Sequence, residues 1–175
     1  DATIIALTYI PDTERFAAKK GAVHSGRSAW RFLAESAKVR KAAEEKAFDI
    51  LCVRPFRNMT APREFRLFIH QGELRLMSQY WLLRHFRRLE TRRQKYWEQA
   101  SKLVSQIVSF LPEQNLALDI YFTHRGDILI LDMNPWGTPT DPLLARTWER
   151  DWTKTEGIIL MPSPLQITGD VNVSF

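Results

Sequence analysis

The segment 116–135 constrains the fold of this chain more than any other part of its sequence. Two apolar runs, Leu116–Phe122 and Ile128–Met133, flank the turn-forming pair Arg125–Gly126. Apolar, partly alternating runs on either side of a short glycine-containing turn are typical of a β-hairpin. The sequence therefore predicts two antiparallel strands with one apolar face, which must pack against another layer of structure.

The register of this hairpin follows from the length of its turn. A two-residue turn at Arg125–Gly126 would place Tyr121 opposite Ile130 and Asp119 opposite Asp132 on the neighbouring strand. Directly opposed residues have Cβ atoms about 4.5–5.5 Å apart, and like charges at that separation are destabilising. The sequence therefore predicts two facing carboxylates whose repulsion must be offset.

A divalent cation would offset that repulsion. Asn134 shares the face of Asp132, because side chains on a strand alternate with a period of two. Mg²⁺ takes oxygen ligands from one or two carboxylates and fills its other positions with water and substrate phosphates. We therefore predict that Asp119, Asp132 and Asn134 bind a metal ion. The alternative is that one of the aspartates caps a turn or pairs with an arginine.

A second hairpin is predicted upstream, around the turn Gln71–Gly72. Phe65, Leu67 and Ile69 share one face of its first strand and are expected to face a core, so that Arg66 projects from the opposite face. A planar guanidinium at such a position can bind phosphate or carboxylate. Counting across this turn places Gln79 opposite Glu64. The alternative is a surface ion pair between Glu64 and Arg66.

Helices and a further strand complete the predicted organisation. Helical spacing of apolar residues predicts one helix from the capping serines Ser25 or Ser28 to about Ala47, and another within Arg84–Leu111 that ends at Pro112. With 175 residues, the chain has the usual size of one domain. We therefore predict an α+β fold, in which helices pack on one side of an antiparallel sheet.

The apolar run that ends at Pro55 is predicted to be a strand. Backbone groups at the end of such a strand can bind the edge of an adenine while the side chains pack against the base, and a plain core strand is the alternative. The four residues concerned are Leu51, Cys52, Val53 and Arg54.

Charge and composition limit the choice of partners. Much of the net charge of +5 comes from the basic stretch Arg84–Lys95, which is either a solvated helix face or a surface for nucleic acid, anionic lipid or phosphates. Cys52 is the single cysteine, so no internal disulfide can form, and a reducing cytoplasmic location is expected. No apolar run approaches the roughly 20 residues that cross a bilayer, so we expect no membrane association.

These motifs together resemble one protein family. Leu118-Asp119-Ile120-Tyr121 followed by Leu131-Asp132-Met133-Asn134-Pro135-Trp136-Gly137 is similar to the cell division cycle protein 123 family. Glu64-Phe65-Arg66-Leu67-Phe68 and Ser78-Gln79 extend the resemblance, as do Thr140-Asp141 and Trp148-Glu149. Asp1-Ala2 resembles an earlier segment of that family. Tyr80-Trp81 stands where the family tends to carry Arg-Asp.

The resemblance implies an ATP-grasp-like fold, in which nucleotide lies between two antiparallel sheets. It implies that Asp119, Asp132 and Asn134 hold Mg²⁺ and the triphosphate of ATP. It further implies that Leu51–Arg54 line the adenine. Arg66 would face the phosphates or an acceptor, so Arg66 and Asp132 are the expected catalytic residues. Metal and arginine would neutralise charge on the transferring phosphoryl group.

Three functions remain open at this stage. Other ATP-grasp proteins are ligases, and a ligase that joins a carboxylate to an amine through an acyl phosphate is the favoured expectation, with an unknown acceptor. The first alternative is an ATP-regulated assembly factor that binds a translation factor or another protein. The second is a nucleic-acid-associated protein that uses Arg84–Lys95.

The domain expected from the resemblance spans residues 1–152, followed by a tail at 153–175 that is either irregular or an added strand. The family's phosphate-contacting lysine would lie upstream of Asp1-Ala2. We therefore expect an incomplete amino-terminal lobe in a truncated or processed segment.

Overall fold

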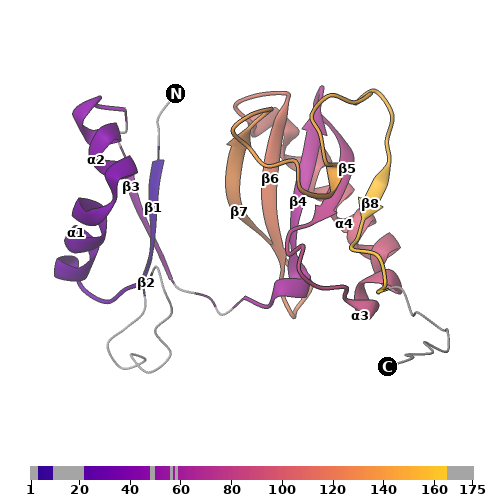
Figure 1. Cartoon of the computed structure of the whole chain (residues 1–175), viewed down its shortest axis with the longest axis horizontal. Helices are drawn as coiled ribbons and strands as arrows, with labels where there is room; N and C mark the ends of the chain where they lie inside the picture. The colour runs from indigo at the N-terminus through magenta and orange to yellow at the C-terminus, as the bar shows by residue number, and fades with distance from the viewer. Residues whose placement is uncertain (1–3, 10–21, 48–49, 56, 58, 165–175) are drawn as a thin grey trace, which may run out of the picture. The chain divides into compact units, whose positions relative to one another are not determined.

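The computed structural model describes residues 4–9, 22–47, 50–55, 57 and 59–164. The chain forms two compact units, Asp1–Asn58 and Met59–Phe175, and each is described by itself (Figure 1). The sequence did not anticipate this division, and the predicted boundary after residue 152 stays a prediction. The Asp1-Ala2 motif lies outside the described residues.

The first unit contains a three-stranded parallel sheet in the order β2-β1-β3. Its strands are β1 (Ile4–Tyr9), β2 (Ala22–Val23) and β3 (Ile50–Pro55). Parallel neighbours require a crossover connection, and the two helices between β2 and β3 lie in the connection from β1 to its neighbour β3. The expected antiparallel pairing is therefore wrong for this unit, in which β1 pairs parallel to both of its neighbours.

Two helices replace the single helix predicted to continue to Ala47. Helix α1 (Gly26–Glu35) begins with a reciprocal capping box, in which Ser25 Oγ accepts from Ser28 N (3.2 Å) and Ser28 Oγ accepts from Ser25 N (2.9 Å). Helix α2 (Ala37–Glu44) follows directly. Ser36 separates them, because its extended backbone ends α1 and its hydroxyl caps the next helix at Val39 N (3.4 Å).

The second unit contains a five-stranded sheet in the order β7-β6-β4-β5-β8. Its strands are β4 (Glu64–His70), β5 (Glu73–Gln79), β6 (Leu116–Phe122), β7 (Ile128–Pro135) and β8 (Gly157–Ile159). The first four pair antiparallel as predicted, whereas β8 pairs parallel to β5. The α+β class is confirmed. Within the predicted tail, β8 is the added strand that the sequence allowed.

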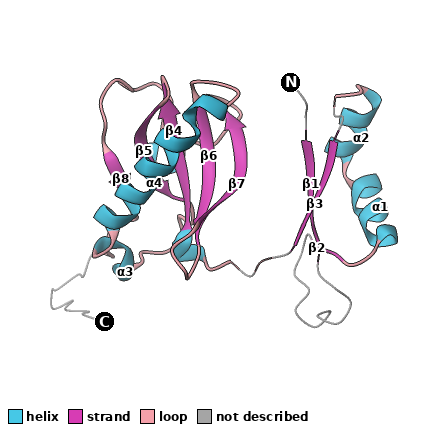
Figure 2. Ribbon diagram, turned by 180° about the vertical axis from the view of Figure 1, so that it is seen from behind, coloured by secondary structure: helices cyan, strands magenta, loops and turns pink. Residues whose placement is uncertain are grey.

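One face of this sheet packs against helix α4 (Arg93–Ile107), as Figure 2 shows from the helix side. Tyr96, Ala100 and Val104 recur at intervals of four residues on α4 and are buried against the sheet. The strands contribute the fully buried side chains Phe65, Leu67, Ile69, Met77, Leu118 and Ile120. We name this surface of the sheet the helix face.

Helix α4 is shorter than the predicted Arg84–Leu111. The basic stretch first forms the single turn α3 (Arg87–Glu90), and α4 starts only at Arg93. A 3₁₀ turn, η3 (Val108–Phe110), follows α4 before Pro112. No helix among the described residues combines the length and the apolar character needed to span a bilayer.

The opposite face of the sheet, which we name the open face, has a smaller apolar cluster at one end. Phe68 stacks on Trp152, with ring centroids 5.4 Å apart, and lies edge-on to Trp148 at 5.4 Å. Trp136 packs against both tryptophans. The segment after β7 crosses over the sheet (Figure 1), and its three tryptophans pack with Phe68. The cluster leaves the other end of the open face to polar side chains.

Both hairpins contain a β-bulge, and the bulges decide which predicted pairs form. In the β6–β7 hairpin, Thr123 N donates to Asp127 O (2.8 Å), so the turn is one residue longer than predicted. Tyr121 consequently pairs with Leu129, and the predicted pair of Tyr121 with Ile130 is wrong. A bulge past Asp119 then restores the register, and Asp119 faces Asp132 as predicted.

In the β4–β5 hairpin the turn has the predicted length, and a bulge then changes the register. His70 pairs with Glu73, as the predicted turn Gln71–Gly72 requires. A bulge between Phe68 and Ile69 then shifts every later pair by one residue. Gln79 therefore lies opposite Phe65, and the predicted pair of Gln79 with Glu64 is wrong.

Candidate functional site

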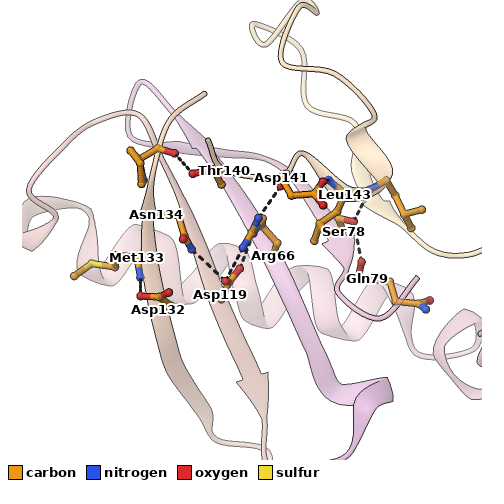
Figure 3. Close-up of polar contacts among 12 residues, drawn as sticks. Arg66, Ser78, Gln79, Asp119, Asp132, Met133, Asn134, Thr140, Asp141 and Leu143 are labelled. Atoms are coloured by element: carbon orange, nitrogen blue, oxygen red, sulfur yellow. Dashed lines mark hydrogen bonds and ion pairs between the residues drawn. The ribbon is translucent and has the colours of Figure 1, made fainter. Parts of the chain in front are cut away.

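A row of polar side chains crosses the open face of the five-stranded sheet. Ser78 on β5 pairs with Arg66 on β4, Arg66 pairs with Asp119 on β6, and Asp119 pairs with Asp132 on β7. The pairs are in register, so the four side chains share one face (Figure 3). We name Ser78, Arg66, Asp119 and Asp132 the polar row.

The centre of the polar row is a buried ion pair. Arg66 Nε donates to Asp119 Oδ1 (2.7 Å) and Arg66 Nη2 donates to Asp119 Oδ2 (2.8 Å), a bidentate geometry. The two residues are only 5% and 4% exposed. Burial alone would lower the pKa of Arg66, but the hydrogen bonds and charge of Asp119 raise it. Arg66 and Asp119 are therefore held as a charged pair.

This ion pair changes the argument for a metal. Asp119 and Asp132 face each other as predicted, but the repulsion between them is offset by the guanidinium of Arg66. The alternative weighed from the sequence, an aspartate paired with an arginine, therefore describes Asp119. Among the described residues, no group of three or more His, Cys, Asp or Glu side chains has the arrangement of a metal site.

Asp132 ends the polar row on the edge strand β7, and Asn134 lies on the same face of that strand. Asn134 Nδ2 donates to Asp119 Oδ2 (3.1 Å), so the amide oxygen of Asn134 points away from that bond. Asp132 is exposed, and its Oδ1 accepts from the backbone N–H of Met133 (3.0 Å). The structure thus brings Asp119, Asp132 and Asn134 together on one face, as the sequence predicted.

The loop of residues 140–144, which follows β7, forms hydrogen bonds with the polar row. Arg66 Nη1 donates to the backbone oxygen of Asp141 (2.6 Å), and the backbone N–H of Leu144 donates to Ser78 Oγ (3.2 Å). Thr140 Oγ1 donates to the backbone oxygen of Pro135 (2.8 Å), which closes the loop on β7 (Figure 3). The three polar contacts fix the backbone of residues 140–144 over the row.

Arg66 therefore has a structural role that the sequence did not predict. Three of its five N–H groups are used within the protein, by Asp119 and by Asp141. The guanidinium also lies 5.5 Å from the centre of the Tyr80 ring. Its catalytic role towards phosphate or an acceptor stays a prediction, with two N–H groups left for it.

Glu64 neighbours the polar row on β4. Trp81 Nε1 donates to Glu64 Oε2 (2.8 Å), so the predicted alternative of a Glu64–Arg66 pair does not form. Burial raises the pKa of Glu64, and burial together with the charge of Asp119 raises the pKa of Tyr80. These shifts show that the carboxylate and the phenol share a partly dehydrated environment with the buried ion pair.

Gln79 is a residue whose role was not found from the sequence. Its side chain is fully buried. Gln79 Nε2 donates to the backbone oxygens of Trp81 and Arg84 (2.8 Å for Arg84), and Gln79 Oε1 accepts from Met161 N (3.2 Å). The amide thus joins two loops that lie far apart in the sequence. The sequence did contain a sign of its importance, the family motif Ser78-Gln79. The predicted register, however, paired Gln79 with Glu64 on the face of Arg66, whereas Gln79 pairs with Phe65.

The residues predicted to line an adenine lie on β3 of the first unit. Leu51 and Val53, on one face of the strand, are 46% and 57% exposed, whereas Cys52 and Arg54 are half-buried. Two exposed apolar side chains at alternate positions differ from the plain core strand that was the alternative. Because the two units are described separately, the contribution of Leu51–Arg54 to a nucleotide site stays a prediction.

Comparisons with known proteins point in one direction. A model of the D123 family matches residues 28–155. A translation initiation factor eIF2 assembly protein of Xenopus laevis is 26% identical over 100 residues, which cover 57% of this chain and 29% of the relative. The protein of the same description from Danio rerio is 27% identical over 107 residues, covering 57% of this chain and 28% of the relative. The chain therefore spans less than a third of the curated relatives.

Solved structures support the fold. The structure of Cdc123 from Schizosaccharomyces pombe matches 85% of this chain and 66% of that chain, with a TM-score of 0.66 and 20% identity. A C-terminally truncated form matches 62% of this chain with a TM-score of 0.55 and 24% identity. At these identities the structures carry the fold alone.

Proposed function

The chain belongs to the D123 family, as its motifs predicted, and from this membership we propose that it is the nucleotide-binding part of an assembly factor for a translation initiation factor. The observation that carries the proposal is the polar row, which lies within the segment matched by the family model. The names of the relatives support the assembly role, since they are described as eIF2 assembly proteins.

The nucleotide in this proposal is Mg-ATP. Asp132 and Asn134 are oxygen-bearing side chains on one strand face, next to Asp119, and such donors suit Mg²⁺. The carboxylate of Asp132 is exposed and uses one oxygen for a backbone contact. The metal would neutralise the phosphates of ATP. In the proposal Asp132 and Asn134 bind the ion, while Asp119 is held by Arg66 and orients Asn134.

A ligase that joins a carboxylate to an amine was the favoured expectation from the sequence, and the comparisons favour the assembly factor instead. The two functions differ in what ATP is used for. A ligase consumes ATP only when both an acceptor carboxylate and an amine are supplied. An assembly factor is expected to bind its protein partner more tightly in the ATP-bound state. Nucleic-acid binding through Arg84–Lys95 and a cytoplasmic location stay predictions.

Thermal unfolding in the presence of Mg-ATP tests the nucleotide site. Ligand at about 100 times its dissociation constant should stabilise the chain by roughly 2.7 kcal/mol. Asp132→Asn removes one exposed carboxylate and should abolish most of this stabilisation. Glu98→Gln removes an exposed carboxylate from α4 and is the matched control, which should retain it. Equal stabilisation of all three proteins would exclude Asp132 as a ligand of the metal.

Binding to purified eIF2 subunits tests the assembly role separately. We expect association that strengthens with Mg-ATP and weakens in Asp132→Asn. Association of equal strength with and without Mg-ATP would show that the chain binds eIF2 subunits but that nucleotide does not regulate this binding. ATP hydrolysis that requires an added carboxylate and amine, without association, would favour the ligase.

A further inference from the structure

A polar cavity lies in the second unit, Met59–Phe175, where the β6–β7 turn meets the start of α4. Its volume is about 230 Å³. Four basic side chains line it, namely Arg63, Arg92, Lys95 and His124. Arg92 and Lys95 come from the basic stretch singled out in the sequence, whereas Arg63 and His124 come from distant segments. The fold therefore gathers positive charge that is dispersed along the chain.

Arg63 is fixed in position by the turn it approaches. Its Nη1 donates to the backbone oxygens of Thr123 (2.7 Å) and Phe122 (3.3 Å). These bonds use one nitrogen of the guanidinium and leave Nε and Nη2 for a ligand. An arginine held in this way loses little side-chain freedom when it binds an anion.

The positive charge of this cavity is not compensated by protein carboxylates. No Asp or Glu lines the cavity, and within the part of the chain that the structure describes, none of Arg63, Arg92, Lys95 and His124 forms an ion pair. The residue before α4, Arg92, provides no side-chain cap for the first N–H groups of that helix. The helix dipole adds positive potential at the same end.

We propose that this cavity binds a single phosphate group, either as free phosphate or on a phosphorylated side chain of a protein partner. A phosphate monoester carries a charge of about −1.5 to −2 at pH 7 and has three acceptor oxygens, which match several cationic donors better than one carboxylate does. Pockets for drug-sized ligands measure about 300–1,000 Å³, so a cavity of about 230 Å³ suits one phosphate rather than a nucleotide.

The site is distinct from the polar row. Its residues lie at the β6–β7 turn and on α4, whereas the polar row lies on the open face of the sheet. Asp132→Asn should therefore leave phosphate binding unchanged, and loss of phosphate binding should leave Mg-ATP stabilisation unchanged. The two proposals can fail independently.

The test is a titration of the whole chain with inorganic phosphate, with a phosphoserine peptide and with the same peptide unphosphorylated, at constant ionic strength. Backbone amide chemical shifts of Thr123 and Gly126 report binding at the turn. We expect saturable shifts with phosphate or with the phosphopeptide, and none with the unphosphorylated peptide. Tighter binding of the phosphopeptide identifies a modified partner as the source, and equal binding identifies free phosphate.

Variants distinguish a site from general attraction. The double substitution Arg92→Gln/Lys95→Gln should weaken binding by about tenfold or more, because it removes two charge-assisted contacts. Lys102→Gln lies two turns beyond Lys95 on α4 and removes one positive charge from an exposed position outside the cavity, so it should leave the affinity unchanged. Both changes are at exposed residues and should preserve folding.

Three results would overturn the proposal. These are an absence of saturable shifts, equal losses in the double variant and in Lys102→Gln, and tighter binding of single-stranded RNA with a steep salt dependence. The last result would assign the basic residues to a nucleic-acid surface, since the slope of log affinity against log salt counts the phosphates contacted.

Discussion

The two faces of the five-stranded sheet are built from alternate residues of the same strands, yet they differ at their centres. The helix face buries large apolar side chains against α4, with Phe65, Leu67 and Leu118 fully excluded from solvent. The open face carries the polar row, where a buried ion pair replaces apolar contact. Adjacent positions such as Phe65 and Arg66 thus serve different purposes.

The difference shows how the sheet separates stability from recognition. Burial of apolar area is non-directional and depends on the area removed from water rather than on exact angles between groups. A bidentate ion pair is directional, and it contributes geometry more than net stability because desolvation offsets much of its attraction. The helix face is therefore expected to determine whether the unit folds, and the open face to determine where Asp132, Asn134 and the loop 140–144 lie.

The largest effect is expected on the helix face. Phe65→Ala should lower the free energy of unfolding by about 4 kcal/mol, because it removes a fully buried ring and leaves a cavity. The ring also contacts Tyr96 at 5.5 Å and Phe122 at 5.7 Å between centroids. Urea denaturation measures the loss. Ile130→Ala, at the exposed edge of the same face, should cost far less, and equal losses would contradict the assignment of the core.

The next effect is expected at the centre of the open face. Arg66→Met should cost about 3 kcal/mol, because it leaves the Asp119 carboxylate buried and unpaired. The double variant Arg66→Met/Asp119→Leu should regain much of that loss. Lys154→Met disrupts an exposed pair with Asp151 and should change stability by less than about 0.5 kcal/mol. Additive losses in the double variant would show that the pair is not coupled.

A smaller effect is expected where the loop 140–144 meets the polar row. Ser78→Ala removes the acceptor for Leu144 N and should cost about 1 kcal/mol. Exchange of the Leu144 amide hydrogen should become faster, because the loop loses one of its attachments. Ser105→Ala, on the exposed surface of α4, serves as the control and should have almost no effect. Unchanged exchange at Leu144 would show that the contacts of Arg66 and Thr140 are enough to hold the loop.

The contrast between the two faces could be predicted from alternation along the strands, but their registers could not. Alternation needs only the sequence of one strand, and it correctly assigned Arg66 and Phe65 to opposite faces. Register depends on turn length and on bulges, which involve two strands at once. Asp119 and Asp132 were paired correctly because a longer turn and a bulge compensate for each other. In the β4–β5 hairpin a bulge stands without a compensating change in turn length, so the predicted partner of Gln79 was wrong.

The partner of Asp119 illustrates a second limit. The sequence predicted two facing carboxylates and contains 25 lysines and arginines, and nothing in it identifies which of them pairs with Asp119. Only the pairing of β4 with β6 places Arg66 opposite Asp119, and these strands are separated by more than forty residues that include α4. The parallel pairing of β1 with β3 was missed for the same reason, since neighbours whose connection contains helices leave no turn signal in the sequence.

The smallest effect is expected from Glu64, at the margin of the open face. Burial raises its pKa above the ordinary value of 4.5, so the folded state holds a proton more tightly than the unfolded state. Its contribution to stability is therefore lost as the pH rises from about 4.5 through the raised pKa. Glu64→Gln keeps an oxygen that accepts from Trp81 Nε1 and removes the charge.

The glutamine variant should therefore be more stable than the natural chain at pH 7 and equally stable at pH values below 4.5. Urea denaturation across this pH range measures the difference. A variant that is less stable at pH 7 would show that the attraction of Arg66 for the Glu64 carboxylate outweighs its burial. In that case the open face would hold Glu64 as a third member of the ion pair, and the polar row would extend to the Trp81 loop.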